Sequence, residues 1–166
     1  MKKLVLLLVV CVLAVTIAGQ PVSAETNLNL YLGMSNASSL KVKEGRSSVI
    51  GGRLQYWLPT NEFFGVGFDI FSFKTNAIDL LAESGLAMLR VPLGKDSQYP
   101  TGKFFPYLAA GPALISGTGM ATLALDFKGG IAWYVDTNLA IFGEHRLLNS
   151  TEIEIQQFVG GIQFKF

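Results

Sequence analysis

The feature that most constrains this chain is a series of eight short segments in which apolar residues alternate with small or polar ones. A two-residue period predicts β-strands, because successive side chains of a strand point to opposite faces. Turn-forming residues such as Gly, Pro, Asn and Asp separate the segments. The predicted strands cover residues 28–34, 48–58, 64–73, 80–91, 105–115, 122–135, 139–147 and 152–166.

The two faces of these strands have an unusual composition. One face carries Leu, Ile, Phe and Trp, and the other carries mainly Gly, Ala, Gln and isolated charges. A water-soluble barrel would need many Lys, Glu, Thr and Ser side chains on its exterior. The pattern instead predicts lipid-facing apolar residues around an interior of small side chains and a few charges. We therefore expect an all-β fold, an eight-stranded antiparallel up-and-down transmembrane β-barrel over residues 25–166, with a soluble lipocalin-like barrel as the alternative.

Two segments leave room for other structures. Glu83 and Arg90 have opposite parity in the fourth segment, so a regular strand cannot turn both away from the apolar face. A bulge at Gly85, a position of Glu83 at the barrel rim, or an amphipathic helix over residues 79–89 would each resolve this. Residues 104–125 carry no charge, but two prolines and three glycines favour two strands over a membrane helix.

The N-terminus has the pattern of an export signal. Lys2 and Lys3 precede an apolar run over residues 4–18, and small residues at 22–24 predict cleavage after Ala24. A retained anchor helix is the alternative. The only cysteine is Cys11, inside this segment, so the mature chain would have neither a disulfide nor a thiolate nucleophile. Removing two of the 13 basic residues leaves 11 against 12 acidic ones, a formal charge of −1 that does not suggest nucleic-acid binding.

The last segment ends on Phe166 with the apolar residues on one parity, which predicts a closing strand with its lipid face outward. "GGIQFKF", "FFPYLAAGPAL" and "LAIFGEHRL" together with the signal resemble the OmpA-like outer-membrane β-barrel proteins. The resemblance covers nearly all of residues 25–166, without a following peptidoglycan-binding domain. It implies the bacterial outer membrane of a Gram-negative cell, and insertion by the outer-membrane assembly machinery, which recognises the last strand. We expect interface aromatics at Tyr56, Trp133, Phe164 and Phe166.

Charged residues on the less apolar face form the candidate functional site. Three cations and three anions are expected inside the barrel, where buried charges must pair. A structural ion-pair network is one interpretation, and a gate whose pairs exchange to pass ions or small solutes is the other. The predicted interior polar network comprises Arg53, Asp69, Asp126, Lys128, Glu144 and Arg146.

The only histidine, His145, is predicted to face lipid near the outer rim. Together with Ser150, Glu152 and Glu154 it raises the alternative of a lipid A-modifying acyl hydrolase. However, position 147 is Leu, where a His-x-Ser spacing would require serine. One histidine and scattered carboxylates give no support for a metal site, and no cofactor is expected.

The predicted outer loops are residues 35–47, 74–78, 116–121 and 148–151, and the longest inner turn is 93–103. The first loop is polar and basic, so it could contact the acidic groups of lipopolysaccharide. The sequence thus favours a non-enzymatic outer-membrane protein with a structural or surface-interaction role. Its expected partners are outer-membrane lipid, lipopolysaccharide and the assembly machinery.

Overall fold

The computed structural model describes residues 25–39, 45–59, 61, 63–74, 79–93, 104–117, 119–151 and 153–166. The predicted signal (1–24) and parts of the predicted loops lie outside these residues. No helix in the described part is long and apolar enough to cross a membrane. The strands are β1 (Glu25–Ser39), β2 (Gly45–Trp57), β3 (Phe64–Lys74), β4 (Asp79–Arg90), β5 (Phe104–Gly117), β6 (Met120–Tyr134), β7 (Leu139–Asn149) and β8 (Ile153–Lys165).

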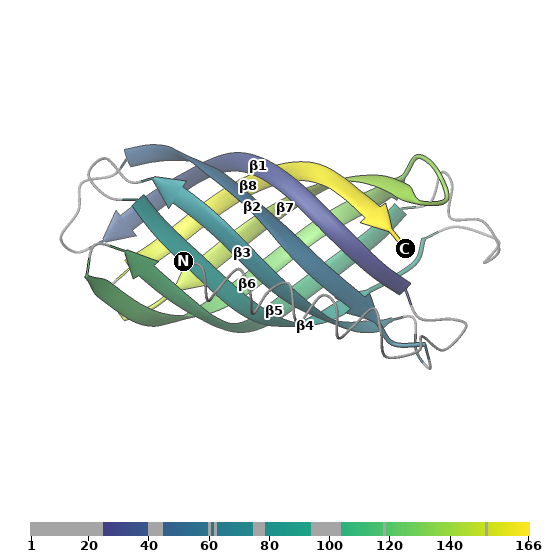
Figure 1. Ribbon diagram of the computed structural model, residues 1–166, viewed down its shortest axis with the longest axis horizontal. Coiled ribbons are helices and arrows are strands. Elements are labelled where there is room, and N and C mark those ends of the chain that lie inside the picture. Colours follow the sequence, from purple (N-terminus) through teal and green to yellow (C-terminus); the bar gives the residue numbers. More distant parts are fainter. Residues whose placement is uncertain are drawn as a thin grey trace.

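These strands form a closed antiparallel barrel in which each strand pairs with its neighbours in sequence (Figure 1). β1 also pairs with β8, so the sheet has no free edge. The predicted eight-stranded up-and-down barrel is confirmed. We call the end that holds Glu25 and Lys165 the terminal end (right in Figure 1) and the opposite end the far end.

The register of the strands fixes the tilt of the barrel wall. Following paired residues once around the barrel from Tyr56 of β2 returns to β2 at Arg46, ten residues away; the path is Tyr56, Val66, Ala87, Ala110, Phe127, Leu147, Gln156, Asn36 and Arg46. With the usual rise and spacing of strands, this stagger corresponds to a tilt of roughly 40°. That tilt lies in the range of membrane barrels.

The outer wall of the barrel is apolar. Large apolar side chains on it are highly exposed, among them Leu32 at 70%, Ile50 at 68% and Leu123 at 74%. The predicted interior charges, by contrast, are buried. Because the closed sheet pairs its backbone groups internally, this apolar wall can face hydrocarbon. The inverted polarity predicted from the alternation is therefore confirmed, and the soluble lipocalin-like alternative is wrong.

The expectation that small side chains and a few charges fill the lumen is wrong at the far end. Seven large or branched apolar side chains point inward there and are at most 5% exposed. Phe71 and Phe73 stack with ring centroids 6.0 Å apart. A lumen without a pore must be filled to the density of a protein interior, which large apolar groups achieve here. We call this set the apolar layer; its members are Val49, Phe71, Phe73, Leu80, Ile115, Leu148 and Ile155.

β4 keeps its inward–outward alternation along its whole length, although its pairing with β5 is interrupted between Ser84 and Ala87. It pairs with β3 without interruption from Lys74↔Asp79 to Phe64↔Leu89, so the predicted bulge at Gly85 and the alternative helix are both wrong. Arg90 faces the lumen, and Glu83 faces outward, four residues after the start of β4 at the far end. The opposite parity of the two charges therefore needs no change of register.

The far-end strands are longer than predicted. β1 continues to Ser39 and β2 starts at Gly45, so most of the predicted loop over residues 35–47 belongs to the sheet. The residues between them, 40–44, lie outside the described part. The uncharged segment over 104–125 forms β5 and the start of β6, so the membrane-helix alternative is wrong.

Candidate functional site in the barrel lumen

Alternation places all six predicted interior charges on the lumen side of four strands. Arg53 lies on β2, Asp69 on β3, two residues on β6 and two on β7. The sheet pairs Arg53 with Asp69 and Lys128 with Arg146. Neither of these cross-strand neighbours forms an ion pair. The ion pairs form instead within β6 and within β7, and across the lumen between β2 and β7 and between β3 and both β6 and β7.

The contacts join the six groups into one chain of alternating charge. Arg53 Nη1 lies 2.5 Å from Glu144 Oε2, and Glu144 Oε1 lies 2.9 Å from Arg146 Nη2. Arg146 Nη2 is also 2.9 Å from Asp69 Oδ2. Lys128 pairs with Asp69 and lies 3.0 Å from Asp126. We call this set the ionic chain: Arg53, Glu144, Arg146, Asp69, Lys128 and Asp126.

Every side chain of the ionic chain is fully buried. Removing charges from water is costly, and such pairs contribute to stability only when each charge has good partners. Here each carboxylate has at least one cation, and the three positive and three negative groups balance. The arrangement therefore links β2, β3, β6 and β7 through the centre of the barrel.

Sequence reasoning missed four neutral partners of the ionic chain. The Tyr31 hydroxyl donates to Asp69, and the Tyr107 hydroxyl donates to Glu144 over 2.8 Å. Ser84 Oγ donates to Asp126 over 2.6 Å, and Arg146 donates to Gln157 over 3.5 Å. All four share the lumen-side parity of their strands. Parity predicts from the sequence that these side chains face the lumen. It does not distinguish them from lumen residues that make no contact with the ionic chain.

Two glycines make room for the tyrosines. A Cβ at Gly51 would lie 2.5 Å from the Tyr31 hydroxyl oxygen, and one at Gly130 would lie 2.7 Å from the Tyr107 ring. Both contacts are shorter than packed atoms allow. The glycines therefore let each phenol cross the lumen and reach its carboxylate.

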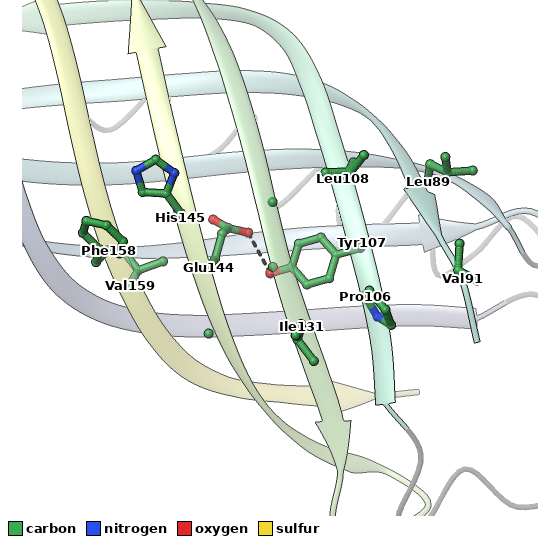
Figure 2. Close-up of a pocket in the computed structure, with 13 residues that line it drawn as sticks. Leu89, Val91, Pro106, Tyr107, Leu108, Ile131, Glu144, His145, Phe158 and Val159 are labelled. Carbon is green, nitrogen blue, oxygen red and sulfur yellow. Dashed lines mark hydrogen bonds between the residues drawn. The ribbon is translucent and has the colours of Figure 1, made fainter. Parts of the chain in front are cut away.

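The outer wall carries a shallow apolar groove behind the ionic chain. Figure 2 shows that Glu144 and His145, neighbours on β7, point to opposite sides of the wall. Glu144 reaches the Tyr107 hydroxyl inside, whereas the ring of His145 lies 4.5 Å from that of Phe158 outside. The groove measures about 810 Å³; besides these residues it is lined mainly by Leu89, Leu108, Gly129, Ile131 and Gly143.

His145 was predicted to lie near the rim, but it lies four residues inside the end of β7. Its cross-strand neighbours are Gly129 and Phe158. Glu154 pairs with Asn149, so it lies about 13 Å along the sheet from His145 at the usual strand rise. Glu152 lies outside the described residues. Among those described, no nucleophile lies beside the imidazole, and the geometry does not support an acyl-transfer site.

A prediction follows for lipid A. Because His145 packs on Phe158 without an adjacent nucleophile, His145→Ala is expected to leave the acyl chains of lipid A unchanged. The measurement is mass spectrometry of lipid A from cells that express either form, with cells lacking the protein as the control. A loss of acyl chains that depends on His145 would contradict this.

The four predicted interface aromatics differ in exposure but lie at one end. Trp133, Phe164 and Phe166 are exposed, and Tyr56 is half-buried on the outer face. Each lies within two residues of the terminal end of its strand or just beyond it. Trp133 stacks on Phe104 with centroids 5.9 Å apart. Their contact with a membrane interface stays a prediction. Within the described ranges, no group of three His, Cys, Asp or Glu side chains is arranged to hold a metal ion.

No family model matches the sequence, and no curated protein matches it significantly. Solved structures do match. Neisserial surface protein A is 17% identical with a TM-score of 0.62, over 85% of this chain and 97% of that one. The N-terminal β-barrel domain of OprF from Pseudomonas aeruginosa is 14% identical with a TM-score of 0.63, over 86% and 97%. Ail, the attachment invasion locus protein of Yersinia pestis, is 15% identical with a TM-score of 0.56, over 87% and 99%.

At such low identity the likeness concerns the fold. Each match spans nearly the whole of the other chain, so the likeness extends over the closed meander of eight strands. The chain has the fold of small eight-stranded outer-membrane β-barrels, as its resemblance to the OmpA-like proteins implied.

Proposed function

We propose that this protein is a structural barrel of a bacterial outer membrane, closed to ions and solutes and without enzymatic activity. The observation that carries the proposal is the filling of the lumen. The ionic chain occupies its centre, and the apolar layer covers the chain at the far end. Phe71 joins the two, because its ring lies 4.3 Å from the Arg146 guanidinium carbon. A conducting path would need continuous water, which a packed apolar layer excludes.

Planar-bilayer recording tests this directly. The purified barrel is expected to give no current steps above the background of detergent alone. Because the apolar layer blocks the far end whatever the state of the ionic chain, Glu144→Ala and Arg146→Ala are expected to stay silent as well. The control is an unrelated porin under the same conditions. Regular current steps from the wild type would contradict the closed lumen.

One observation favours a second candidate, a small-solute or ion channel gated by the ionic chain. Arg146 Nη2 is equally far, 2.9 Å, from carboxylate oxygens of Asp69 and Glu144. A cation shared between two anions could move toward either one and so rearrange the chain. If this candidate is correct, current steps appear in the bilayer and change in the Glu144 and Arg146 variants.

The proposed role includes contact of the barrel surface with lipid and lipopolysaccharide. The exposed apolar wall supports contact with lipid chains, and exposed Arg46 at the far end supports contact with acidic headgroups. Two of the three basic residues of the loop that motivated the lipopolysaccharide prediction, Lys41 and Lys43, lie outside the described residues. Ail, one of the structural neighbours, has been solved in complex with the heparin analogue sucrose octasulfate. An anionic saccharide is accordingly the first ligand to test on this barrel.

Export and insertion complete the proposal. Residues 1–24 would act as a cleaved signal, with both chain ends then in the periplasm and the far end at the cell surface. The assembly machinery would recognise the last strand, β8, which ends beside Phe166. The backbone N–H of Phe166 donates to the Thr26 carbonyl over 2.9 Å, which supports a role of this segment in closing the barrel.

A further inference from the structure

A second ionic cluster lies at the terminal end of the lumen, apart from the ionic chain. Its centre is the Glu25 carboxylate on β1. Arg90 of β4 donates to both of its oxygens, over 2.7 and 3.1 Å, and Lys165 of β8 lies 3.1 Å away. Tyr134 of β6 and Asn27 of β1 donate to the same carboxylate over 3.0 and 2.7 Å. We call Glu25, Arg90 and Lys165 the latch.

The latch and two aromatic side chains cover the terminal end of the lumen together. The Arg90 guanidinium lies 4.2 Å from the centre of the Trp57 ring and 5.4 Å from that of Phe105. The Glu25 carboxylate is contacted by residues of four strands, β1, β4, β6 and β8. The contacts require β1 and β8 to be side by side, so the latch exists only in the closed barrel.

Between the latch and the ionic chain, β1 and β2 present a ladder of polar side chains to the lumen. In register order the pairs are Glu25↔Trp57, Asn27↔Gln55 and Asn29↔Arg53. Each of these side chains except Glu25 is at most 4% exposed. The ladder therefore runs from the latch to the first cation of the ionic chain.

Six polar atoms of this ladder lack hydrogen-bond partners within the protein. Both polar atoms of Asn29 have none. The carbonyl oxygens of Asn27 and Gln55, the indole Nε1 of Trp57 and Nε of Arg53 have none either. We call Asn27, Asn29, Gln55 and Trp57 the inner polar patch.

Six neighbouring orphan atoms need an explanation, because buried polar groups almost always have a partner. These include both donors and acceptors, and they lie on one stretch of the lumen wall formed by β1 and β2. Water is the ligand that serves donors and acceptors alike, and internal water typically binds such groups. At the far end Ser47 Oγ is another such atom, but Val49 of the apolar layer lies between it and Arg53 on β2, so water would have to reach the patch from the terminal end.

We propose that the inner polar patch is an internal hydration site that exchanges with solvent at the terminal end, and that the latch controls this exchange. The site is a dead end, since the ionic chain and the apolar layer lie beyond it. The barrel would therefore take up water, and small hydrogen-bonding solutes of similar size, from one side without conducting them.

Trp57 is a direct reporter, because its indole N–H is one of the orphan donors and the chain has two tryptophans. Trp133→Phe removes the other, which faces outward beside Phe104. In this variant of the full chain, labelled with ¹⁵N-tryptophan and held in deuterated detergent micelles, the indole signal belongs to Trp57. We expect a nuclear Overhauser cross-peak between this N–H and water, and exchange of its proton with D2O.

Glu25→Gln tests the latch in the same background. It removes the charge that holds Arg90 and Lys165, so exchange of the Trp57 indole proton is expected to become at least tenfold faster. Asp79→Asn is the matched control, because its pair with Lys74 at the far end is exposed and should leave the rate unchanged. If Glu25→Gln prevents folding, Lys165→Met weakens the latch while keeping Arg90, with a smaller acceleration expected.

Two results would overturn the proposal. Absence of the water cross-peak, with indole exchange as slow as that of the strand amides in every variant, would show that the patch is dry. A hydrated indole whose exchange ignores both Glu25→Gln and Lys165→Met would refute control by the latch. Neither result changes the expectation that the barrel gives no current steps in a planar bilayer. The closed lumen is therefore tested separately, by bilayer recording.

Discussion

Replacing Asp69 by Ala should lower the free energy of unfolding by roughly 3–5 kcal/mol, the cost of leaving a buried charge without its partner. Asp69 accepts from Tyr31, Lys128 and Arg146, so its loss leaves the ionic chain with one excess positive charge. The measurement is unfolding by denaturant in micelles or vesicles, monitored by the difference in gel mobility between the folded and the heated form.

Two further variants make this result specific to the buried charge. Asp69→Ala combined with Arg146→Met restores charge balance, leaves the pairs Arg53–Glu144 and Lys128–Asp126 in place, and should recover part of the loss. Asp79→Asn, which breaks the exposed pair with Lys74, should change stability by no more than about 0.5 kcal/mol. Equal losses in Asp69→Ala and Asp79→Asn would show that the ionic chain does not stabilise the barrel.

Phe73→Ala is expected to have the second large effect, with a loss of roughly 3–5 kcal/mol in unfolding free energy. The Phe73 side chain is 1% exposed within the apolar layer and stacks on Phe71, so truncation leaves a cavity in a packed region. The measurement is the same unfolding titration, with bilayer recording alongside it.

Phe68→Ala is the matched control on the same strand. Phe68 is 45% exposed on the outer wall, where lipid chains can fill the space that the ring leaves. Its loss should therefore cost much less than that of Phe73. Similar costs at the two positions would indicate that the apolar layer is not a packed core.

Alternation in the sequence was enough to predict the strands and the polarity of the wall. The eight segments correspond to the eight observed strands, because a side chain on a strand can face only the lumen or the lipid. The same rule placed Arg53 and Glu144 inside. Parity alone does not say how far apart two residues lie around the barrel. The ion pair that Arg53 and Glu144 form across the lumen could therefore not be derived from the sequence. That pair depends on the ten-residue stagger, which the pairing of all eight strands sets together.

The apolar layer was missed for a related reason. In β3 the alternation is clear from Phe64 to Ile70, but the next four residues, Phe71 to Lys74, place two aromatic rings on the lumen side. Apolar residues on both faces carry no period, so the pattern gives no direction there. The latch was missed as well, since Glu25 lies before the first predicted strand and Arg90 was treated as a conflict of register.

The balance of the ionic chain has a consequence under voltage. An electric potential across a bilayer acts on each elementary charge that moves through it with about 2.3 kcal/mol per 100 mV. Three cations and three anions that are bound to one another have no net charge, so the force on the group as a whole cancels. A polarised membrane would therefore not pull the ionic chain as a unit toward either face.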